Sequence, residues 1–247
     1  MPVQSVSNVK VVVPAFNEEA TIAPVVAAIQ AEGFGVVVVD DGSRDQTREV
    51  AAQAGATVLA LPFNLGVGGA LRAGLLYASR EADAIAVQCD ADGQHPPAEI
   101  KHLLEALDGA DIVIGSRFAG KGAYVARGPR RWAMTMLGAV MSRLHHVRLS
   151  DVTSGFRAFS PQAVSVLAQR LPPDYLADTV LALMIAKEYG LRVTQVPVEM
   201  RERQGGMASS GPFRSVFYLA RAVMLVALGL LSLGLRSASR RLGGEGR

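Results

Sequence analysis

Residues 35 to 43 read GVVVVDDGS, an apolar run that stops at two aspartates and a glycine. Four consecutive valines favour a β-strand, and a strand that is apolar on both sides suits a parallel sheet with helices on both faces. Ligands of such sheets bind beyond the carboxyl ends of the strands. The stretch therefore predicts a buried strand whose end borders a ligand site.

Similar runs recur through the first half of the chain. Further apolar and β-branched stretches are KVVVP (10–14), ATVLAL (56–61), AIAVQCD (84–90) and DIVIG (111–115). Amphipathic patterns typical of helices fill the gaps, over residues 18–32, 44–54, 67–81 and 97–108. Strands that alternate with helices predict an α/β fold, in which a mostly parallel central sheet carries helices on both faces.

The pattern changes beyond residue 116. A Met-rich helical stretch (131–146) precedes the segment DVTSGFRAFS (151–160), two more helices, and a last strand within LRVTQVPVEM (191–200). At 247 residues the chain can bury a full core. We assign residues 1–212 to one domain and 213–247 to a C-terminal segment.

The C-terminal segment combines an apolar helix with basic flanks. The stretch VFYLARAVMLVALGLLSLGL (216–235) has about the length that crosses a bilayer, roughly 20 residues, but Arg221 interrupts it. We therefore expect a helix that lies in or dips into the membrane interface, and a helix that forms a dimer or covers the core is the alternative.

The distribution of charge favours lipid over nucleic acid as a partner. The chain carries a formal charge of +3, but residues 199–247 hold eight arginines against three glutamates, which leaves residues 1–198 at −2. Arginines scattered beside an apolar stretch indicate anionic lipid. A single cysteine, Cys89, allows no internal disulfide, and the N-terminus lacks a signal-peptide pattern. We expect a peripheral or monotopic protein at the cytoplasmic side of the cell membrane.

Acidic and polar residues gather where the expected strands end. The strand ends carry Pro14-Ala15-Phe16-Asn17-Glu18, Asp40-Asp41, Asp90-Ala91-Asp92-Gly93-Gln94 and Gly115-Ser116-Arg117. Carboxylates on one edge repel each other unless a cation or hydrogen-bond donors neutralise them. Asp90 and Asp92 suit a hard ion such as Mg²⁺ or Mn²⁺, which completes its shell with phosphate and water. The alternative for Asp92-Gly93 is a simple turn.

A glycine-rich run, NLGVGGALRAG (64–74), follows the third strand. It places Asn64 and Gly66 at the start of a helix, where backbone amides can approach a ligand. The run lacks the Gly-x-Gly-x-x-Gly spacing of dinucleotide-binding folds and does not follow the first strand. A dehydrogenase is therefore disfavoured.

Six motifs follow one another along residues 9–206: VVVPAFNEE, VVVVDDGSRDQT, NLGVGGALRAG, QCDADGQHPP, VIGSRF and DVTSGFRAF. In this order they resemble family 2 glycosyltransferases, most closely the polyprenyl-phosphate (dolichyl-phosphate) mannose and glucose synthases. The resemblance implies a GT-A fold for the catalytic domain and an inverting transfer of a hexose from a nucleotide diphosphate sugar, GDP-mannose or UDP-glucose. It implies a polyprenyl phosphate acceptor at a membrane surface. Whether copies of the chain form a homo-oligomer is left open.

The resemblance also implies roles for individual residues. The donor nucleotide would contact Pro14, Phe16, Glu18, Asp40, Asp41, Asn64, Gly66, Asp90, Ala91, Asp92 and Gln94. Asp90 and Asp92 would hold Mg²⁺ or Mn²⁺ and, with Arg117, act in catalysis. The acceptor or its phosphate would contact Arg117, Ser154, Arg157 and Arg203. Relatives usually have Arg-x-x-Gly-x-Ser-Lys after the last strand, whereas here Ser209 stands in place of the lysine.

Other functions stay open at this point. A hydroxyl acceptor, soluble or on a glycan, would need a base such as Asp92 or Asp151, whereas a lipid phosphate is already anionic and needs only orienting cations. A non-catalytic membrane subunit that binds nucleotide sugars is disfavoured by the intact acidic strand ends. The sequence PAFNEE argues against a nucleotidyltransferase, which would have a Gly-rich basic signature there.

Three further residues have structural expectations. His95 is a candidate for a contact that supports the metal-binding carboxylates. Cys89 is expected to pack as a small apolar side chain. Ser43, with Gln46 three residues later, has the spacing of a helix capping box.

Overall fold

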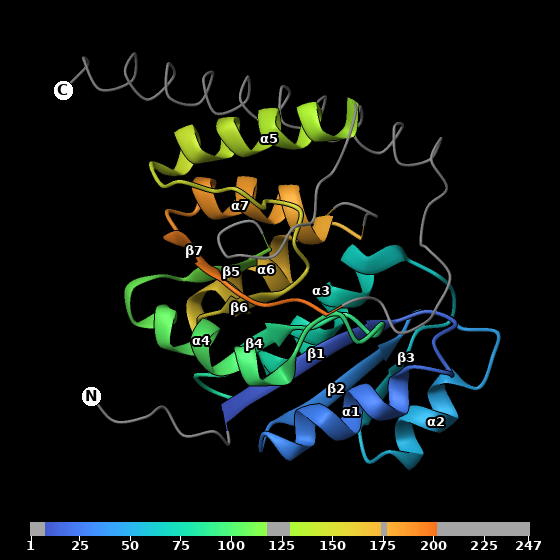
Figure 1. Ribbon diagram of the computed structural model, residues 1–247. Coiled ribbons are helices and arrows are strands. Elements are labelled where there is room, and N and C mark those ends of the chain that lie inside the picture. Colours follow the sequence, from blue (N-terminus) through green and yellow to red (C-terminus); the bar gives the residue numbers. More distant parts are fainter. Residues whose placement is uncertain (1–7, 118–128, 174–176, 202–247) are drawn as a thin grey trace. The chain divides into compact units, whose positions relative to one another are not determined.

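The sheet of the computed structural model has seven strands in the residues that it describes, 8–117, 129–173 and 177–201. Their order is β3-β2-β1-β4-β6-β5-β7 (Figure 1). The bounds are β1 Val9–Ala15, β2 Gly35–Asp40, β3 Thr57–Ala60, β4 Ile85–Gln88, β5 Ile112–Ser116, β6 Arg157–Phe159 and β7 Val193–Pro197. Only β6 among these strands is antiparallel to its neighbours, β4 and β5. The expected α/β fold with a mostly parallel sheet is confirmed.

Helices follow most of the strands. The longer ones are α1 Ile22–Ala31, α2 Thr47–Gln53, α3 Gly66–Ala78, α4 Ile100–Glu105, α5 Pro129–His145, α6 Pro161–Arg170 and α7 Ala182–Glu188. Short turns of other helix types occur at Pro97–Glu99, Ala106–Gly109 and Ala177–Leu181. Each amphipathic stretch expected from the sequence contains a helix.

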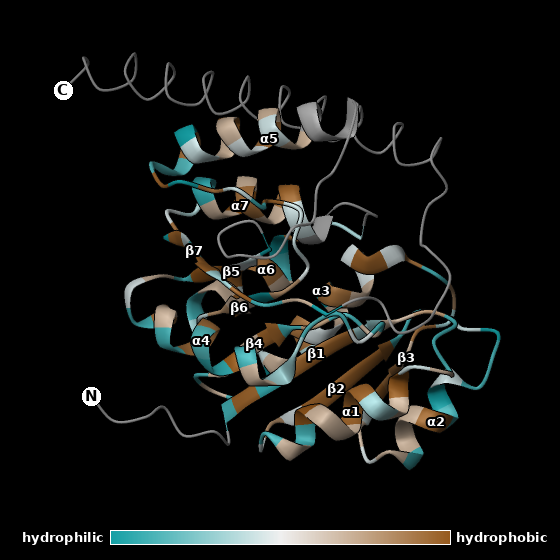
Figure 2. Ribbon diagram, in the orientation of Figure 1, coloured by the Kyte–Doolittle hydropathy of each residue, from teal (hydrophilic) through white to brown (hydrophobic). Residues whose placement is uncertain are grey.

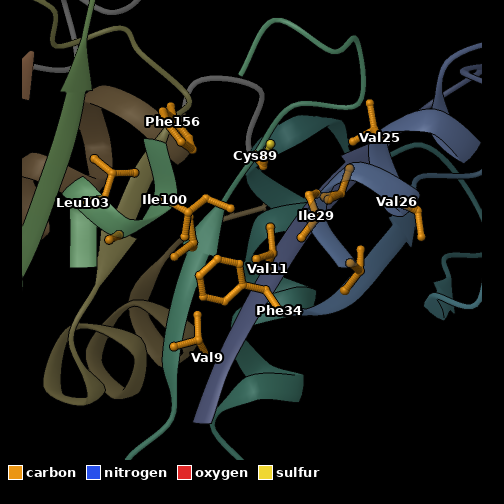
Figure 3. Close-up of a cluster of buried hydrophobic side chains, with 14 of the residues drawn as sticks. Val9, Val11, Val25, Val26, Ile29, Phe34, Cys89, Ile100, Leu103 and Phe156 are labelled. Carbon is orange, nitrogen blue, oxygen red and sulfur yellow. The ribbon is translucent and has the colours of Figure 1, made fainter. Parts of the chain in front are cut away.

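One face of the sheet packs against α1, α2 and α4. Buried hydrophobic side chains form a cluster between the sheet and these helices. The cluster combines Val9 and Val11 of β1 with Ile29 of α1 and Leu103 of α4 (Figure 3). In Figure 2, β1 and β2 are coloured mostly as hydrophobic. Cys89 lies in this cluster with 1% of its surface exposed, and burial, helped by Asp90 and Asp92, raises the pKa of its thiol well above the ordinary value. Its expected role as a small apolar side chain is confirmed.

The opposite face packs against α3 and α6. A Cβ added to Gly74 of α3 would lie 2.3 Å from Val12 Cγ1, so glycine lets this helix approach the sheet. Arg72 then donates from Nε to the carbonyl of Ala168 in α6, at 3.2 Å. The later glycines of the run at 64–74 therefore serve close packing, and its first residues border the site.

The described residues belong to one compact unit, Met1–Ala208. Within them, none of the helices has the length and apolar composition needed to cross a bilayer. The expected interfacial helix (216–235), the boundary at 212 and Arg203 lie outside the residues that the structure describes. These three predictions stay predictions.

Candidate active site

The carboxyl ends of β1, β2 and β4 meet at one edge of the sheet. Ala15 pairs with Asp40 across β1 and β2, and Val12 pairs with Gln88 across β1 and β4. The residues that follow these strands therefore share one rim, as the sequence predicts. Phe16, the first residue after β1, is 41% exposed on it.

The loops after β1 and β2 are bound to each other by reciprocal hydrogen bonds. The backbone N–H of Asn17 donates to Ser43 Oγ at 3.0 Å, and Arg44 N–H donates back to Asn17 Oδ1 at 2.8 Å. Glu18 N–H donates to Thr47 Oγ1 at 2.8 Å. Asn17 has a φ of 55°, a left-handed conformation that asparagine tolerates better than most residues. The rim is thus braced before any ligand binds.

The capping box expected at Ser43 is wrong. Helix α2 begins at Thr47 after Gln46, and no side chain caps it by a hydrogen bond. Ser43 Oγ instead accepts from Asn17 of the neighbouring loop. The spacing alone did not reveal this long-range partner.

The carboxylate of Asp45 also joins the loops after β1 and β2. Its oxygens accept from Thr47 N–H at 3.0 Å and from Glu19 N–H at 3.3 Å. Burial by itself would raise the pKa of Asp45, but the hydrogen bonds from Thr47 and Glu19 outweigh it and lower the pKa below the ordinary 3.8. The ionised form therefore stabilises the fold.

We expect Asp45→Asn to reduce the free energy of unfolding at pH 7 by about 0.5–1 kcal/mol, since solvent screens this site. A folded pKa below the unfolded one stabilises the fold above pH 3.8, and this stabilisation is lost as the pH falls through the folded pKa. Urea unfolding at pH 7 and at about pH 3 should show a difference from the parent protein that shrinks in acid. Asp83→Asn, at an exposed aspartate, is the control. An equal difference at both pH values would contradict this role.

The two aspartates at the carboxyl end of β2, Asp40 and Asp41, are buried and organise the rim. Asp40 accepts from Ser43 N–H at 3.0 Å, and Asp41 accepts from Leu65 N–H at 2.7 Å and from Gly66 N–H at 2.8 Å. Burial raises the pKa of Asp41, Asp40 adds to the rise, and the two backbone hydrogen bonds oppose it. Asp41 thus attaches the start of α3 to the end of β2, which brings exposed Asn64 and buried Gly66 to the same rim.

Asp90 and Asp92 lie on one tight turn after β4. Asp92 is 7% exposed and its Oδ1 accepts from Gln94 N–H at 3.1 Å, whereas the side chain of Asp90 is 39% exposed. The turn reading is correct, since Gly93 has a φ of 75°. A turn does not exclude a metal role, because it carries two carboxylates within three residues of sequence.

These carboxylates fit a hard divalent ion. A Cβ added to Gly155 would lie 2.8 Å from Asp90 Oδ1, so the glycine leaves space beside that oxygen. The described residues contain no group of three or more acidic, His or Cys side chains placed to hold an ion. Mg²⁺ and Mn²⁺ commonly take one or two carboxylates and complete their shell with phosphate and water. Asp90 and Asp92 match that donor set.

His95 lies behind this turn. Its ring is stacked on Phe156, with centroids 4.7 Å apart and planes 18° from parallel. Burial lowers its pKa to about 4, an effect that Asp92 and Asp151 oppose and Arg117 reinforces. The ring is therefore neutral at physiological pH. The expected supporting contact is made with Asp90, whose backbone N–H donates to His95 Nδ1 at 3.0 Å.

Arg117, after β5, is held by a buried carboxylate. It donates from Nε to Asp151 Oδ2 at 2.7 Å and from Nη2 to Asp151 Oδ1 at 3.0 Å. The arginine side chain is 27% exposed, and that of Asp151 is 0% exposed. A two-bond pair of this kind fixes the plane of the guanidinium. With both its oxygens engaged and no exposed surface, Asp151 is unsuited to be the base for a hydroxyl acceptor.

Arg157 does not lie where the sequence placed it. Its side chain is fully buried and donates to the carbonyls of Ser154 at 2.9 Å, Thr179 at 3.0 Å and Val152 at 2.7 Å. The expected contact with an acceptor phosphate is wrong, because these carbonyls hold the guanidinium inside the protein. Ser154 is 2% exposed, and its Oγ accepts from Phe156 N–H at 3.2 Å. Both residues shape the loop before β6.

The sequence reasoning missed several residues that build this rim. Asp45 and Thr47 brace the first two loops, and Asp151 orients Arg117. Phe63 is 62% exposed and lies beside Gly42. A Cβ added to Gly42 would lie 3.0 Å from the Cα of Phe63. The sequence signal for Phe63 was an aromatic residue in the polar loop before NLGVGG. Asp45, Thr47 and Asp151 gave no such signal, because their roles depend on contacts with residues distant in the sequence.

The mostly parallel sheet, with its Asp-x-Asp turn at the carboxyl edge, has the architecture expected of the GT-A class of fold. The model of the family "Glycosyl transferase family 2" matches residues 10–167, more than half of the chain. The protein therefore belongs to glycosyltransferase family 2 and is an enzyme of that family.

Two relatives by sequence illustrate the range of this family. The UDP-N-acetylglucosamine–dolichyl-phosphate N-acetylglucosaminyltransferase of Methanococcus voltae is 29% identical over 240 residues, which cover 88% of this chain and 95% of the relative. The polyprenol monophosphomannose synthase of Mycolicibacterium smegmatis is 30% identical over 210 residues, covering 80% and 79%.

A solved structure shares the fold. Glucosyl-3-phosphoglycerate synthase from Mycobacterium tuberculosis, in complex with Mn²⁺, UDP-glucose and phosphoglyceric acid, superposes with a TM-score of 0.67 at 27% identity. The match covers 92% of this chain and 79% of that one. The solved structures that share this fold thus include an enzyme crystallised with a divalent ion and a nucleotide sugar.

Proposed function

We propose that this enzyme transfers a hexose, with inversion, from GDP-mannose or UDP-glucose to a polyprenyl phosphate at the cytoplasmic face of a membrane. The observation that carries this proposal is the pairing of Arg117 with buried Asp151. It supplies a fixed cation at the end of β5 and occupies the carboxylate that could otherwise have served as a base. A phosphate acceptor needs a cation that orients it, and it needs no base.

The donor would bind along the braced rim. The proposed nucleotide contacts are Pro14, Phe16, Glu18, Asn64, Gly66, Ala91 and Gln94, with Asp40 and Asp41 holding the loops that present them. Asp90 and Asp92 would hold Mg²⁺ or Mn²⁺, a proposal supported by the solved structure of the same fold, which was crystallised with Mn²⁺. When bound, the ion would neutralise the charge that develops on the departing nucleoside diphosphate.

The acceptor would arrive as an anion beside another anion. Two unit charges 4 Å apart repel by about 4 kcal/mol at an effective dielectric of 20, so cations must offset this repulsion. Arg117 is placed for it, because it directly follows β5 and Asp151 fixes its guanidinium. Arg203 is proposed as a second contact. The relatives that act on dolichyl phosphate or make polyprenol monophosphomannose support this choice of acceptor.

We propose that residues 213–247 attach the catalytic domain, residues 1–212, to the membrane. Deleting 213–247 should shift the protein from the pellet to the supernatant when it is sedimented with anionic phospholipid vesicles. Donor affinity, measured by titration calorimetry, should change by less than about threefold, because the donor rim lies in the catalytic domain.

The deletion has a built-in control in the lipid composition. Vesicles of zwitterionic lipid alone should bind the full-length protein more weakly, since the flanking arginines then lack anionic partners. A truncated protein that still sediments with anionic vesicles would place the attachment elsewhere in the chain.

A hydroxyl acceptor is the second candidate function, favoured by the likeness to a glucosyl-3-phosphoglycerate synthase. The test offers labelled GDP-mannose or UDP-glucose, with Mn²⁺, to the full-length protein together with polyprenyl phosphate, polyprenol or phosphoglyceric acid. We expect label in the organic phase with polyprenyl phosphate alone. Label in phosphoglyceric acid or polyprenol, with none in polyprenyl phosphate, would replace our proposal by the second candidate.

A further inference from the structure

The tautomer of His95 follows from its hydrogen bond. The backbone N–H of Asp90 can only donate, and it points to His95 Nδ1 at 3.0 Å. Nδ1 must therefore be unprotonated and accept, which leaves the proton of the neutral ring on Nε2. Nε2 lies 3.6 Å from Asp90 Oδ2, which is near the carboxylate but beyond hydrogen-bond length. The ring thus accepts a hydrogen bond from the backbone of Asp90 and lies near its side chain.

The position of the ring is fixed from behind. The His95 side chain is 4% exposed and stacks on Phe156, which is fully buried in the hydrophobic cluster of Figure 3. The next residue, Arg157, begins β6 and is held by three backbone carbonyls. A continuous set of contacts therefore runs from the sheet, through Phe156 and His95, to Asp90.

We propose that His95 is a positioning residue, which holds Asp90 in the conformation that binds the divalent ion. The inference rests on the proposed metal site at Asp90 and Asp92. In this arrangement Nδ1 fixes the backbone of Asp90, and the N–H at Nε2 lies near its carboxylate. The partly exposed carboxylate keeps its remaining surface for the ion. Residues that orient metal ligands in this way commonly contribute about 10–100-fold to metal affinity.

A role in packing alone makes a different prediction. If His95 served only to stack on Phe156, then phenylalanine, which keeps an aromatic ring there, would preserve metal binding. If Nδ1 is essential, asparagine should substitute better than glutamine. The Oδ1 atom of asparagine can occupy the place of Nδ1, whereas the amide of glutamine reaches the place of Nε2 and leaves the N–H of Asp90 without its acceptor.

The test measures the Kd of Mn²⁺ for the full-length protein, from the electron paramagnetic resonance signal of free Mn²⁺, with UDP or GDP present. We expect His95→Phe and His95→Gln to raise the Kd by about 10-fold or more, and His95→Asn to stay within about threefold of the parent protein. Thermal melting of each variant reports on folding.

Each outcome bears on the proposal. Unchanged affinity in His95→Phe would overturn it in favour of packing, and equal loss in the asparagine and glutamine variants would also overturn it. If His95→Phe does not fold, the comparison of asparagine with glutamine decides. If the parent protein itself binds no Mn²⁺ with either nucleotide, the metal site fails and the role of His95 with it. The choice of acceptor is tested separately.

Discussion

Replacing Asp92 by asparagine should lower kcat by about 100-fold or more while the protein stays folded, since a metal site supplies several kcal/mol to such a transfer. Asp92 is almost fully buried, and its Oδ1 accepts from Gln94 N–H. The asparagine side chain keeps an oxygen that can accept this hydrogen bond, so the turn should persist. What is lost is the negative charge that we propose for the ion.

The control for this variant is Asp83→Asn. Asp83 lies just before β4, whereas Asp92 lies just beyond the carboxyl end of β4. The side chain of Asp83 is exposed, and the substitution makes the same chemical change there. The turnover of Asp83→Asn with Mn²⁺, measured at steady state, and its melting temperature should equal those of the parent protein. Full activity of Asp92→Asn, or of the parent protein in EDTA, would contradict the metal site.

Replacing Arg117 by alanine should raise the KM for polyprenyl phosphate by about 10–100-fold and leave the donor Kd nearly unchanged, because a charge-assisted contact to the acceptor is lost. Lysine should restore the affinity only in part, since it lacks the planar fork that binds Asp151 through two atoms. Initial rates over a range of polyprenyl phosphate concentrations, together with calorimetric titration of the donor, measure the two effects.

The alanine variant leaves the carboxylate of Asp151 buried without its cation, which can destabilise a protein by about 3–5 kcal/mol. The double variant Arg117→Ala/Asp151→Asn avoids this and should show the same rise in KM. Arg192→Ala is the matched control, because Arg192 pairs with Asp111 at 3.6 Å, at the opposite end of β5. A loss of donor affinity alone in both Arg117 variants would assign this arginine to the donor site.

The sequence was most informative where function depends on a strand and the residues that directly follow it. The predicted strand over 35–40 coincides with β2, and the Asp-x-Asp turn follows β4 as expected. Apolar runs and their polar ends are local properties, so periodicity and spacing suffice to place them. The same reasoning brought Phe16, Asp41 and Asp90 to one edge of the sheet.

The errors arose where a side chain finds a distant partner. The resemblance put Arg157 in a loop beside the acceptor, but Arg157 begins the three-residue strand β6, too short and too polar at its start to be recognised. Its guanidinium then meets the carbonyl of Thr179, 22 residues away. Asp151 lies 34 residues from Arg117, and Ser43 lies 26 residues from Asn17. Such pairs are set by tertiary packing, which the local pattern does not contain.

The acceptor chemistry is tested most directly by phosphorus NMR of the lipid after the full-length protein has consumed a nucleotide diphosphate sugar with polyprenyl phosphate. Transfer to the phosphate converts a phosphomonoester into a phosphodiester, and these two groups give separate signals. We expect the phosphomonoester signal of polyprenyl phosphate to decline as a phosphodiester signal grows in equal amount. If the donor is consumed while the phosphomonoester signal stays unchanged, the hexose goes to another acceptor and polyprenyl phosphate is not the substrate.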